Sequence, residues 1–115
     1  MYDLKAEIAF IPTDLGGRRM PICSGWRPQF RYCDQDEPGD WDVVFFTDEH
    51  VEWVTPGQTV EAYLCFLSPH RQLGKLYPGT EFLLREGARI VAKGKVLEIL
   101  ALEESARKRL ESQSY

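Results

Sequence analysis

The chain has 115 residues, a length that suits one domain built around one hydrophobic core. Hydrophobic residues make up 43% of the sequence and charged residues 28%, which excludes an intrinsically disordered chain and fits a soluble globular protein. The formal net charge of −4 argues against indiscriminate binding to nucleic acid, which needs a surplus of lysine and arginine, but it allows a local basic patch.

Alternating apolar residues predict strands from the beginning of the chain. Residues 4–10 place apolar side chains on one face, namely Leu4, Ala6, Ile8 and Phe10. Gly16 and Gly17 predict a turn in which both residues adopt positive φ angles. Residues 20–34 are expected to be extended, because two prolines within them would break a helix. The side chains on one face of this segment would be Gln29, Arg31 and Cys33.

Short strands separated by turns continue after an acidic loop at residues 34–42. In chain order the predicted strands are residues 43–46, 51–54, 58–67, 80–86 and 89–100. In the second of these, Val51 and Trp53 would share a face. No strand is followed by a helical crossover, so the pattern predicts an antiparallel barrel or sandwich rather than a parallel sheet.

Only the C-terminal segment, residues 102–113, has a helical pattern. It offers ion pairs at i,i+4 spacing between Glu103 and Arg107 and between Glu104 and Lys108. A terminal helix of about three turns is marginal in water unless it packs on the rest of the protein.

Sequence patterns for catalysis are not found. The chain has no GxxxxGK[ST], GxGxxG, GxSxG or HExxH. His50 and His70 lie in different predicted turns, and we expect both on the surface rather than on a metal. Cys33 beside Asp34, with His50 as a base, would be a nucleophile only if folding brought them together, and we favour a half-buried strand cysteine. We predict no enzyme, no cofactor and no metal, and a solvated loop at residues 34–42.

The cysteines and the N-terminus indicate the compartment. Cys23, Cys33 and Cys65 are odd in number and widely spaced, so we expect reduced thiols in a cytoplasmic protein. The N-terminus has no basic stretch followed by a long apolar core, so no signal peptide is expected. No apolar run approaches the roughly 20 residues of a membrane span, so we expect no membrane contact.

Three segments together carry a resemblance to a known family. They are GGRRMPICSGWRPQF (residues 16–30), VTPGQTVEAYLCFLSP (54–69) and FLLREGARIVAKGKVLEIL (82–100). In order and approximate spacing they resemble the C-terminal barrel, domain 3, of the bacterial translation factor elongation factor Tu. The resemblance implies an all-β fold, a six-stranded antiparallel β-barrel over residues 1–101, followed by a short helical or disordered tail over 102–115. It also implies a stand-alone relative without the GTPase domain, and hence no bound nucleotide.

The same resemblance implies a binding role for particular residues. In the family this domain contacts the T-stem of aminoacyl-tRNA, packs on the GTPase domain and meets the nucleotide-exchange factor. The positions that the resemblance assigns to a tRNA or partner contact are Arg18, Arg19, Gln29, Glu86, Gly87 and Arg89. Arginine, glutamine and turn amides suit the phosphates and 2′-hydroxyls through which an A-form stem is recognised.

Departures from the family pattern keep two functions open. Ala88 stands where the family has a second glycine, Ser68 stands where many members have lysine, and the loop at residues 34–42 is acidic, which would repel a phosphate backbone. One function is a non-catalytic module that binds a translation component, either tRNA or a protein. The alternative is a protein-binding adaptor or mimic with no RNA role, with Trp26 and Trp41 as exposed anchors and Trp53 more suited to the core.

Overall fold

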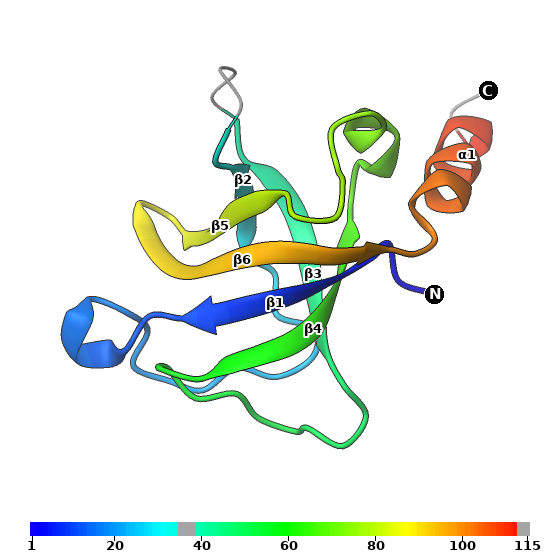
Figure 1. Ribbon diagram of the computed structural model, residues 1–115. Helices are drawn as coiled ribbons and strands as arrows, with labels where there is room; N and C mark the ends of the chain where they lie inside the picture. Colours follow the sequence, from blue (N-terminus) through cyan, green and yellow to red (C-terminus); the bar gives the residue numbers. More distant parts are fainter. Residues whose placement is uncertain (35–38, 113–115) are drawn as a thin grey trace.

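The structure is a computed structural model that describes residues 1–34 and 39–112. Part of the predicted acidic loop and the last residues of the tail, 35–38 and 113–115, lie outside the described residues. The described chain forms six strands, two 3-10 turns and one α-helix (Figure 1). In order these are β1 (Leu4–Phe10), η1 (Thr13–Leu15), β2 (Gln29–Tyr32), β3 (Trp41–Thr47), β4 (Thr59–Phe66), η2 (Pro69–Gln72), β5 (Glu81–Glu86), β6 (Arg89–Ile99) and α1 (Leu102–Ser112).

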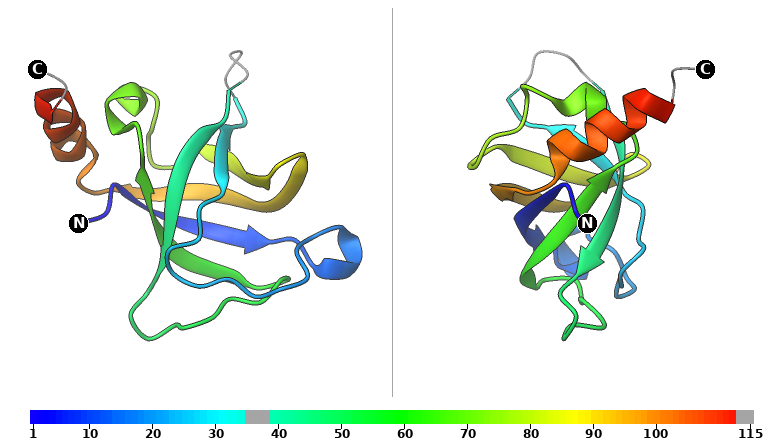
Figure 2. Two further views of the ribbon diagram at one scale, coloured as in Figure 1. Left: turned by 180° about the vertical axis from the view of Figure 1, so that it is seen from behind. Right: turned by 90° about the vertical axis from the view of Figure 1, so that its right-hand side faces the viewer.

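The strands close into a barrel in the order β1-β4-β3-β2-β5-β6, and every neighbouring pair is antiparallel. The long strand β6 pairs with β5 on one side and with β1 on the other, which completes the closure (Figure 2). Register shifts between Lys5 and Ala6 and between Leu84 and Arg85 allow the strands to curve around the core. The six-stranded antiparallel barrel predicted from the sequence is confirmed.

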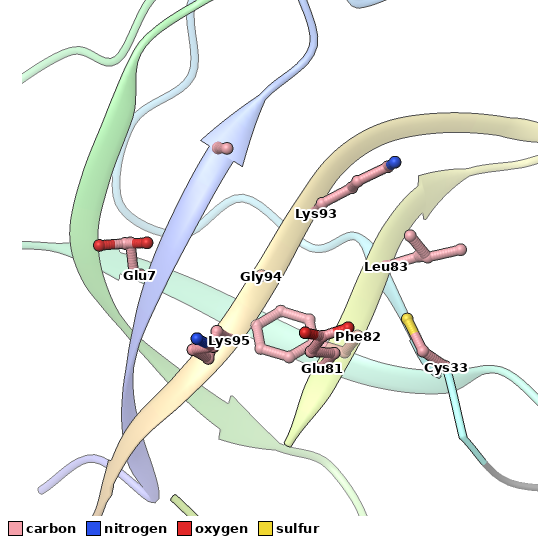
Figure 3. A pocket seen from close by; sticks show the side chains of 9 residues that line it. Glu7, Cys33, Glu81, Phe82, Leu83, Lys93, Gly94 and Lys95 are labelled. Carbon is pink, nitrogen blue, oxygen red and sulfur yellow. The ribbon is translucent and has the colours of Figure 1, made fainter. Parts of the chain in front are cut away.

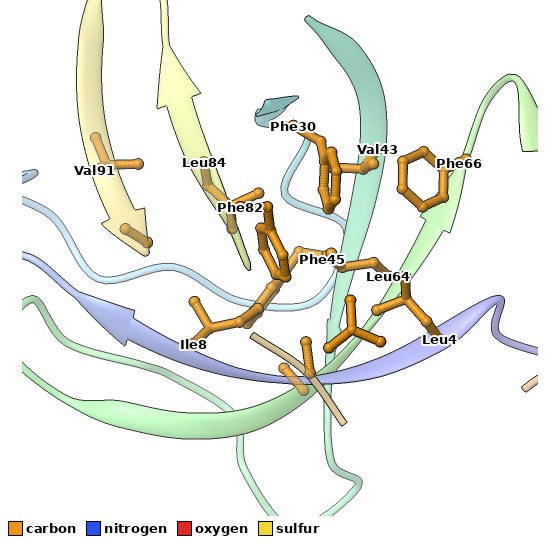
Figure 4. Close-up of a cluster of buried hydrophobic side chains, with 14 of the residues drawn as sticks. Leu4, Ile8, Phe30, Val43, Phe45, Leu64, Phe66, Phe82, Leu84 and Val91 are labelled. Carbon is orange, nitrogen blue, oxygen red and sulfur yellow. The ribbon is translucent and has the colours of Figure 1, made fainter. Parts of the chain in front are cut away.

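The barrel interior is filled by the apolar face of each alternating strand. On β1 the predicted inward residues are all buried. On β4 the alternating residues Ala62, Leu64 and Phe66 are buried, whereas Val60 on the same face is half-buried. Aromatic rings form the centre of the core, where Phe30 stacks on Phe82 with ring centroids 4.5 Å apart (Figure 4). On β2 the side chains of Gln29 and Arg31 are half-buried on the outer face, as predicted.

The predicted strand at residues 51–54 is wrong. The prediction that Trp26 and Trp41 are exposed and that Trp53 is in the core is also wrong. Within that segment only Val54 pairs, through an isolated bridge to Ile22. Trp53 is 55% exposed rather than part of the core, whereas Trp26 and Trp41 pack against the core and are half-buried. The physical reason is that this segment pairs with none of the six described strands, so its short alternation has no sheet face to bury it.

The Gly16-Gly17 turn also differs from the prediction. Gly16 has a φ of 98°, but Gly17 does not have a positive φ. A Cβ atom built on Gly17 would lie 1.9 Å from the carbonyl oxygen of Ile11. Gly17 is therefore required for close approach of two backbones rather than for a left-handed conformation.

The C-terminal helix is packed on the barrel rather than free. Leu102 and Ala106 are buried, and α1 lies beside η2 in both views of Figure 2. Arg107 lies within 4.0 Å of carboxylate oxygens of Glu104 and Glu111 rather than of Glu103, while Glu104 pairs with Lys108 at 3.6 Å as expected. Across the described ranges, no helix has both the length and the apolar character to span a membrane.

Three hydrogen bonds anchor this end of the molecule. The Tyr32 hydroxyl donates to Gln72 Oε1 at 2.6 Å, which fixes η2 to β2. The Asp3 carboxylate accepts from the backbone N–H of Phe66 at 2.7 Å and from the hydroxyl of Ser105 on α1. Asp3 thus joins the N-terminus, β4 and α1 at a position that is only 2% exposed.

The substitution Asp3→Asn is expected to change how stability depends on pH. Burial raises the pKa of Asp3, and the hydrogen bonds from Ser105 and Phe66 offset this only in part. In the folded state the Asp3 carboxyl group therefore keeps its proton to higher pH than in the unfolded state. The contribution of Asp3 to stability is consequently largest in acid and is lost as the pH rises through the pKa of the folded state. Urea unfolding between about pH 4 and pH 7 should show wild type losing stability relative to Asp3→Asn. A pH-independent difference between the two proteins would contradict the prediction.

Candidate binding face

The segments that carry most of the predicted site residues meet at one end of the barrel. Strands β1, β3 and β5 end there, and β2, β4 and β6 begin there, because all neighbouring strands are antiparallel. In Figure 1 the blue turn at η1 and the yellow β5–β6 hairpin extend to the same side. We call the surface formed by residues 15–20, 26–29 and 86–89 the turn face.

A shared carboxylate links the three segments of the turn face. Glu86 Oε1 accepts from Arg18 Nε at 2.8 Å, and Glu86 Oε2 accepts from Trp26 Nε1 at 3.0 Å. The Arg18 guanidinium also lies 5.7 Å from the centroid of the Trp26 ring. Arg18 Nη1 donates to the carbonyl oxygens of Met20 and Pro21 at 2.8 and 3.3 Å. Arg18 and Glu86 are therefore brought together, but much of their bonding capacity is satisfied inside the protein.

Gln29 lies beside a second internal ion pair. On β2 it is paired with Arg85 of β5 on one side and with Asp42 of β3 on the other. Arg85 Nη1 donates to both oxygens of the Asp40 carboxylate at 3.0 and 2.9 Å. Asp40, in the described part of the acidic segment, thus neutralises Arg85, which adjoins the hairpin turn. Gln29 lies between the positive Arg85 and the negative Asp42.

The remaining predicted residues are accessible. Gly87 has a φ of 59° at the hairpin turn, and Arg19 and Arg89 are exposed. In the part of the chain that the structure describes, the side chain of neither arginine forms a hydrogen bond or an ion pair, and the same holds for the side chain of Arg27. A concave surface of about 530 Å³ lies beside Glu86, Ala88 and Arg89. Arg19, Arg27 and Arg89 are therefore the available cations of the turn face.

Sequence reasoning missed several features of this face. It did not identify Trp26 as a partner of Glu86, or Asp40 as the partner of Arg85, because neither spacing has a local signature. Apolar side chains are also exposed at this barrel end, with Leu15 at 73% and Met20 at 67%. The turn face therefore combines arginine, a fixed carboxylate and apolar side chains.

The architecture and these segments agree with a comparison against protein families. The model of the family described as elongation factor Tu C-terminal domain matches residues 1–100. The chain belongs to this family. The matched region of this elongation factor Tu C-terminal domain comprises the whole barrel and ends before α1.

The outer surface of the barrel also has a groove away from the turn face. It lies over β1, β6 and β5, has a volume of about 350 Å³, and is lined by charges of both signs (Figure 3). Those charged residues are Glu7, Glu81, Lys93 and Lys95. The mixture of charges matches no single class of ligand.

Cys33 lines the same groove, but it is exposed and lies just after the end of β2, so the predicted half-buried strand cysteine is wrong. Partial burial raises the pKa of its thiol, and the charges of Glu81 and Asp34 raise it further. His50 follows β3 at the opposite end of the barrel from Cys33, so the fold does not bring this histidine to the thiol. Cys23, Cys33 and Cys65 are all free thiols. Among the described residues, no three histidine, cysteine or acidic side chains gather at a possible metal site.

Proposed function

We propose that this protein is a non-catalytic binding module that contacts a component of the cytoplasmic translation apparatus through the turn face. We further propose that the component is a protein. The observation that supports this choice is the internal neutralisation of two arginines, Arg18 by Glu86 and Arg85 by Asp40. The proposed module binds neither a guanine nucleotide nor a membrane.

The chemistry of the turn face suits a protein partner. Binding to RNA gains affinity when uncompensated cations displace counterions from phosphates, and an arginine already paired with a carboxylate contributes little to this gain. Protein interfaces instead centre on exposed apolar and aromatic side chains with arginine among them. Leu15 and Met20 supply such apolar side chains next to Arg19.

A second candidate function is contact with tRNA. The side chains of Arg19, Arg27 and Arg89 form no hydrogen bond or ion pair in the described chain. Gln29, two residues after Arg27, is half-buried. Arginine and amide groups suit the phosphates and 2′-hydroxyls of an A-form stem. The two candidates differ in the partner but share the same face.

Affinity capture from a host lysate treated with ribonuclease tests the protein partner. We expect wild type to retain a ribosomal protein or translation factor. The variant Arg19→Ala/Met20→Ser/Arg89→Ala should retain at least about 10-fold less of that protein. A matched control is Arg71→Ala/Leu73→Ser/Arg109→Ala, which makes the same kinds of change at exposed residues near η2 and on α1. Retention that is equal in all three proteins, or no enrichment of any translation protein, would contradict the proposal.

A mobility-shift titration with tRNA tests the second candidate separately. The protein-partner proposal expects no saturable complex with tRNA at low salt. Binding through three free arginines would instead give a complex that weakens about 40-fold between 50 and 200 mM salt, and Arg19→Ala/Arg89→Ala would abolish it. The second result would replace the protein partner by tRNA.

A further inference from the structure

An aromatic cluster lies on the outer surface of the barrel, outside the turn face. Phe46 on β3 is paired directly with Tyr63 on β4. Tyr2 stacks on Tyr63, with ring centroids 4.6 Å apart, and lies 5.1 Å from the Phe46 ring. All three side chains are half-buried, so part of the ring surface remains open to solvent. A concavity of about 430 Å³ opens beside Tyr2 and Phe46.

The rim of this concavity is acidic. Asp48, Glu49 and Glu52 line it, and all three are exposed. Within the described ranges no lysine or arginine forms an ion pair with them. Glu49 Oε1 lies 3.4 Å from Nε2 of its neighbour His50, and both side chains are more than 80% exposed.

The charge of this rim acts on Lys5, but Lys5 already forms an ion pair with Glu61. Lys5 Nζ lies 3.0 Å from Glu61 Oε1. The hydrogen bond and charge of Glu61 are the main reasons that the pKa of Lys5 is raised, and Asp48 adds the smallest contribution. The carboxylates of the rim therefore keep most of their negative charge uncompensated.

Thr47 connects the acidic segment to neighbouring residues through hydrogen bonds. The backbone N–H of Thr47 donates to Ser24 Oγ at 2.8 Å, and Thr47 Oγ1 donates to the carbonyl oxygen of Val51 at 2.6 Å. The backbone N–H of Val51 in turn donates to the carbonyl oxygen of Asp48 at 2.9 Å. A partner therefore meets a turn that is already ordered, which lowers the entropy lost on binding.

From this combination we infer a second contact site, the acid–aromatic pocket of Tyr2, Phe46, Asp48, Glu49 and Glu52, which receives lysine or arginine side chains from a basic polypeptide segment. Aromatic faces attract cations within about 6 Å of the ring centroid. Carboxylates bind guanidinium and ammonium groups through charge-assisted hydrogen bonds. The pocket shares no residue with the turn face, so this inference names the chemistry of a protein contact without depending on the proposed function.

A peptide titration tests the inference. The probe is a labelled short peptide that alternates lysine and arginine with glycine, followed by fluorescence anisotropy at low salt, and the comparison peptide has glutamine at every basic position. We expect saturable binding of the basic peptide and at least about 10-fold weaker binding of the glutamine peptide. Glu49→Gln/Glu52→Gln should weaken binding about 10-fold and reduce its salt dependence. Tyr2→Leu should weaken binding about 3-fold and leave the salt dependence unchanged.

Two controls separate this site from general electrostatics and from the turn face. Glu103→Gln/Glu111→Gln removes the same charge from α1 and should leave binding unchanged, as should Arg19→Ala/Met20→Ser/Arg89→Ala on the turn face. If Tyr2→Leu fails to fold, the glutamine substitutions at the rim still decide the result. The inference is overturned by equal binding of both peptides, by equal losses in the α1 control, by absence of binding at low salt, or by spermidine competing as well as the peptide.

Discussion

Replacing Glu86 with alanine is expected to lower the free energy of unfolding by about 2 kcal/mol and to separate the three segments of the turn face. The carboxylate accepts from both Arg18 Nε and Trp26 Nε1, so its loss leaves two donors without their partner in a half-buried site. Urea unfolding measures the change in stability. We expect capture of the proposed partner to fall by at least about 10-fold in the same variant, since preorganisation of the face is lost.

Matched variants make the Glu86 prediction specific. Glu81→Ala removes an exposed carboxylate from the same strand and should change stability by less than about 0.5 kcal/mol. Glu86→Gln keeps one acceptor oxygen and should fall between wild type and Glu86→Ala. In a double-mutant cycle, Arg18→Ala and Glu86→Ala should be non-additive because the two side chains share a hydrogen bond. Additive losses, or a change for Glu86→Ala no larger than that for Glu81→Ala, would contradict the linking role.

Gly94→Ala is expected to destabilise the barrel by about 3 kcal/mol through overpacking. A Cβ atom at this position would lie 2.2 Å from Cζ of Phe82. Phe82 is fully buried and stacks on Phe30, so its ring has little room to move away. The Phe82 ring therefore fits into the core because Gly94 on β6 has no side chain.

A smaller side chain opposite Gly94 should relieve the overpacking. Phe82→Leu alone is expected to cost stability, yet the double variant Gly94→Ala/Phe82→Leu should be less destabilised than the sum of the single changes. Gly39→Ala is the control, since a Cβ there would meet no atom within 4 Å. Urea unfolding of the four variants checks the prediction, and a Gly94→Ala protein as stable as Gly39→Ala would refute it.

The barrel itself was predictable because its main signal is local. Inward and outward side chains alternate along a strand by backbone geometry, so the buried faces of β1 and β4 follow from the order of residues alone. Family-specific turns at residues 16–30 and 82–100 then selected a closed barrel over a sandwich, and the family match agrees. The same local logic failed at residues 51–54, where alternation occurs outside any sheet and Trp53 is left exposed.

The roles of the predicted contact residues depended on tertiary structure. Arg18 and Glu86 are 68 residues apart in the chain, and Arg85 and Asp40 are 45 apart, so only closure of the barrel determines which charges cancel. The acid–aromatic pocket likewise needs the N-terminal Tyr2 to reach Phe46 and the turn after β3. Sequence by itself determined the strand faces, the barrel and its family, because backbone periodicity and turn chemistry are local. Which side chains remain free to bind was decided only by the fold, because charge pairing and exposure arise between segments that are distant in sequence.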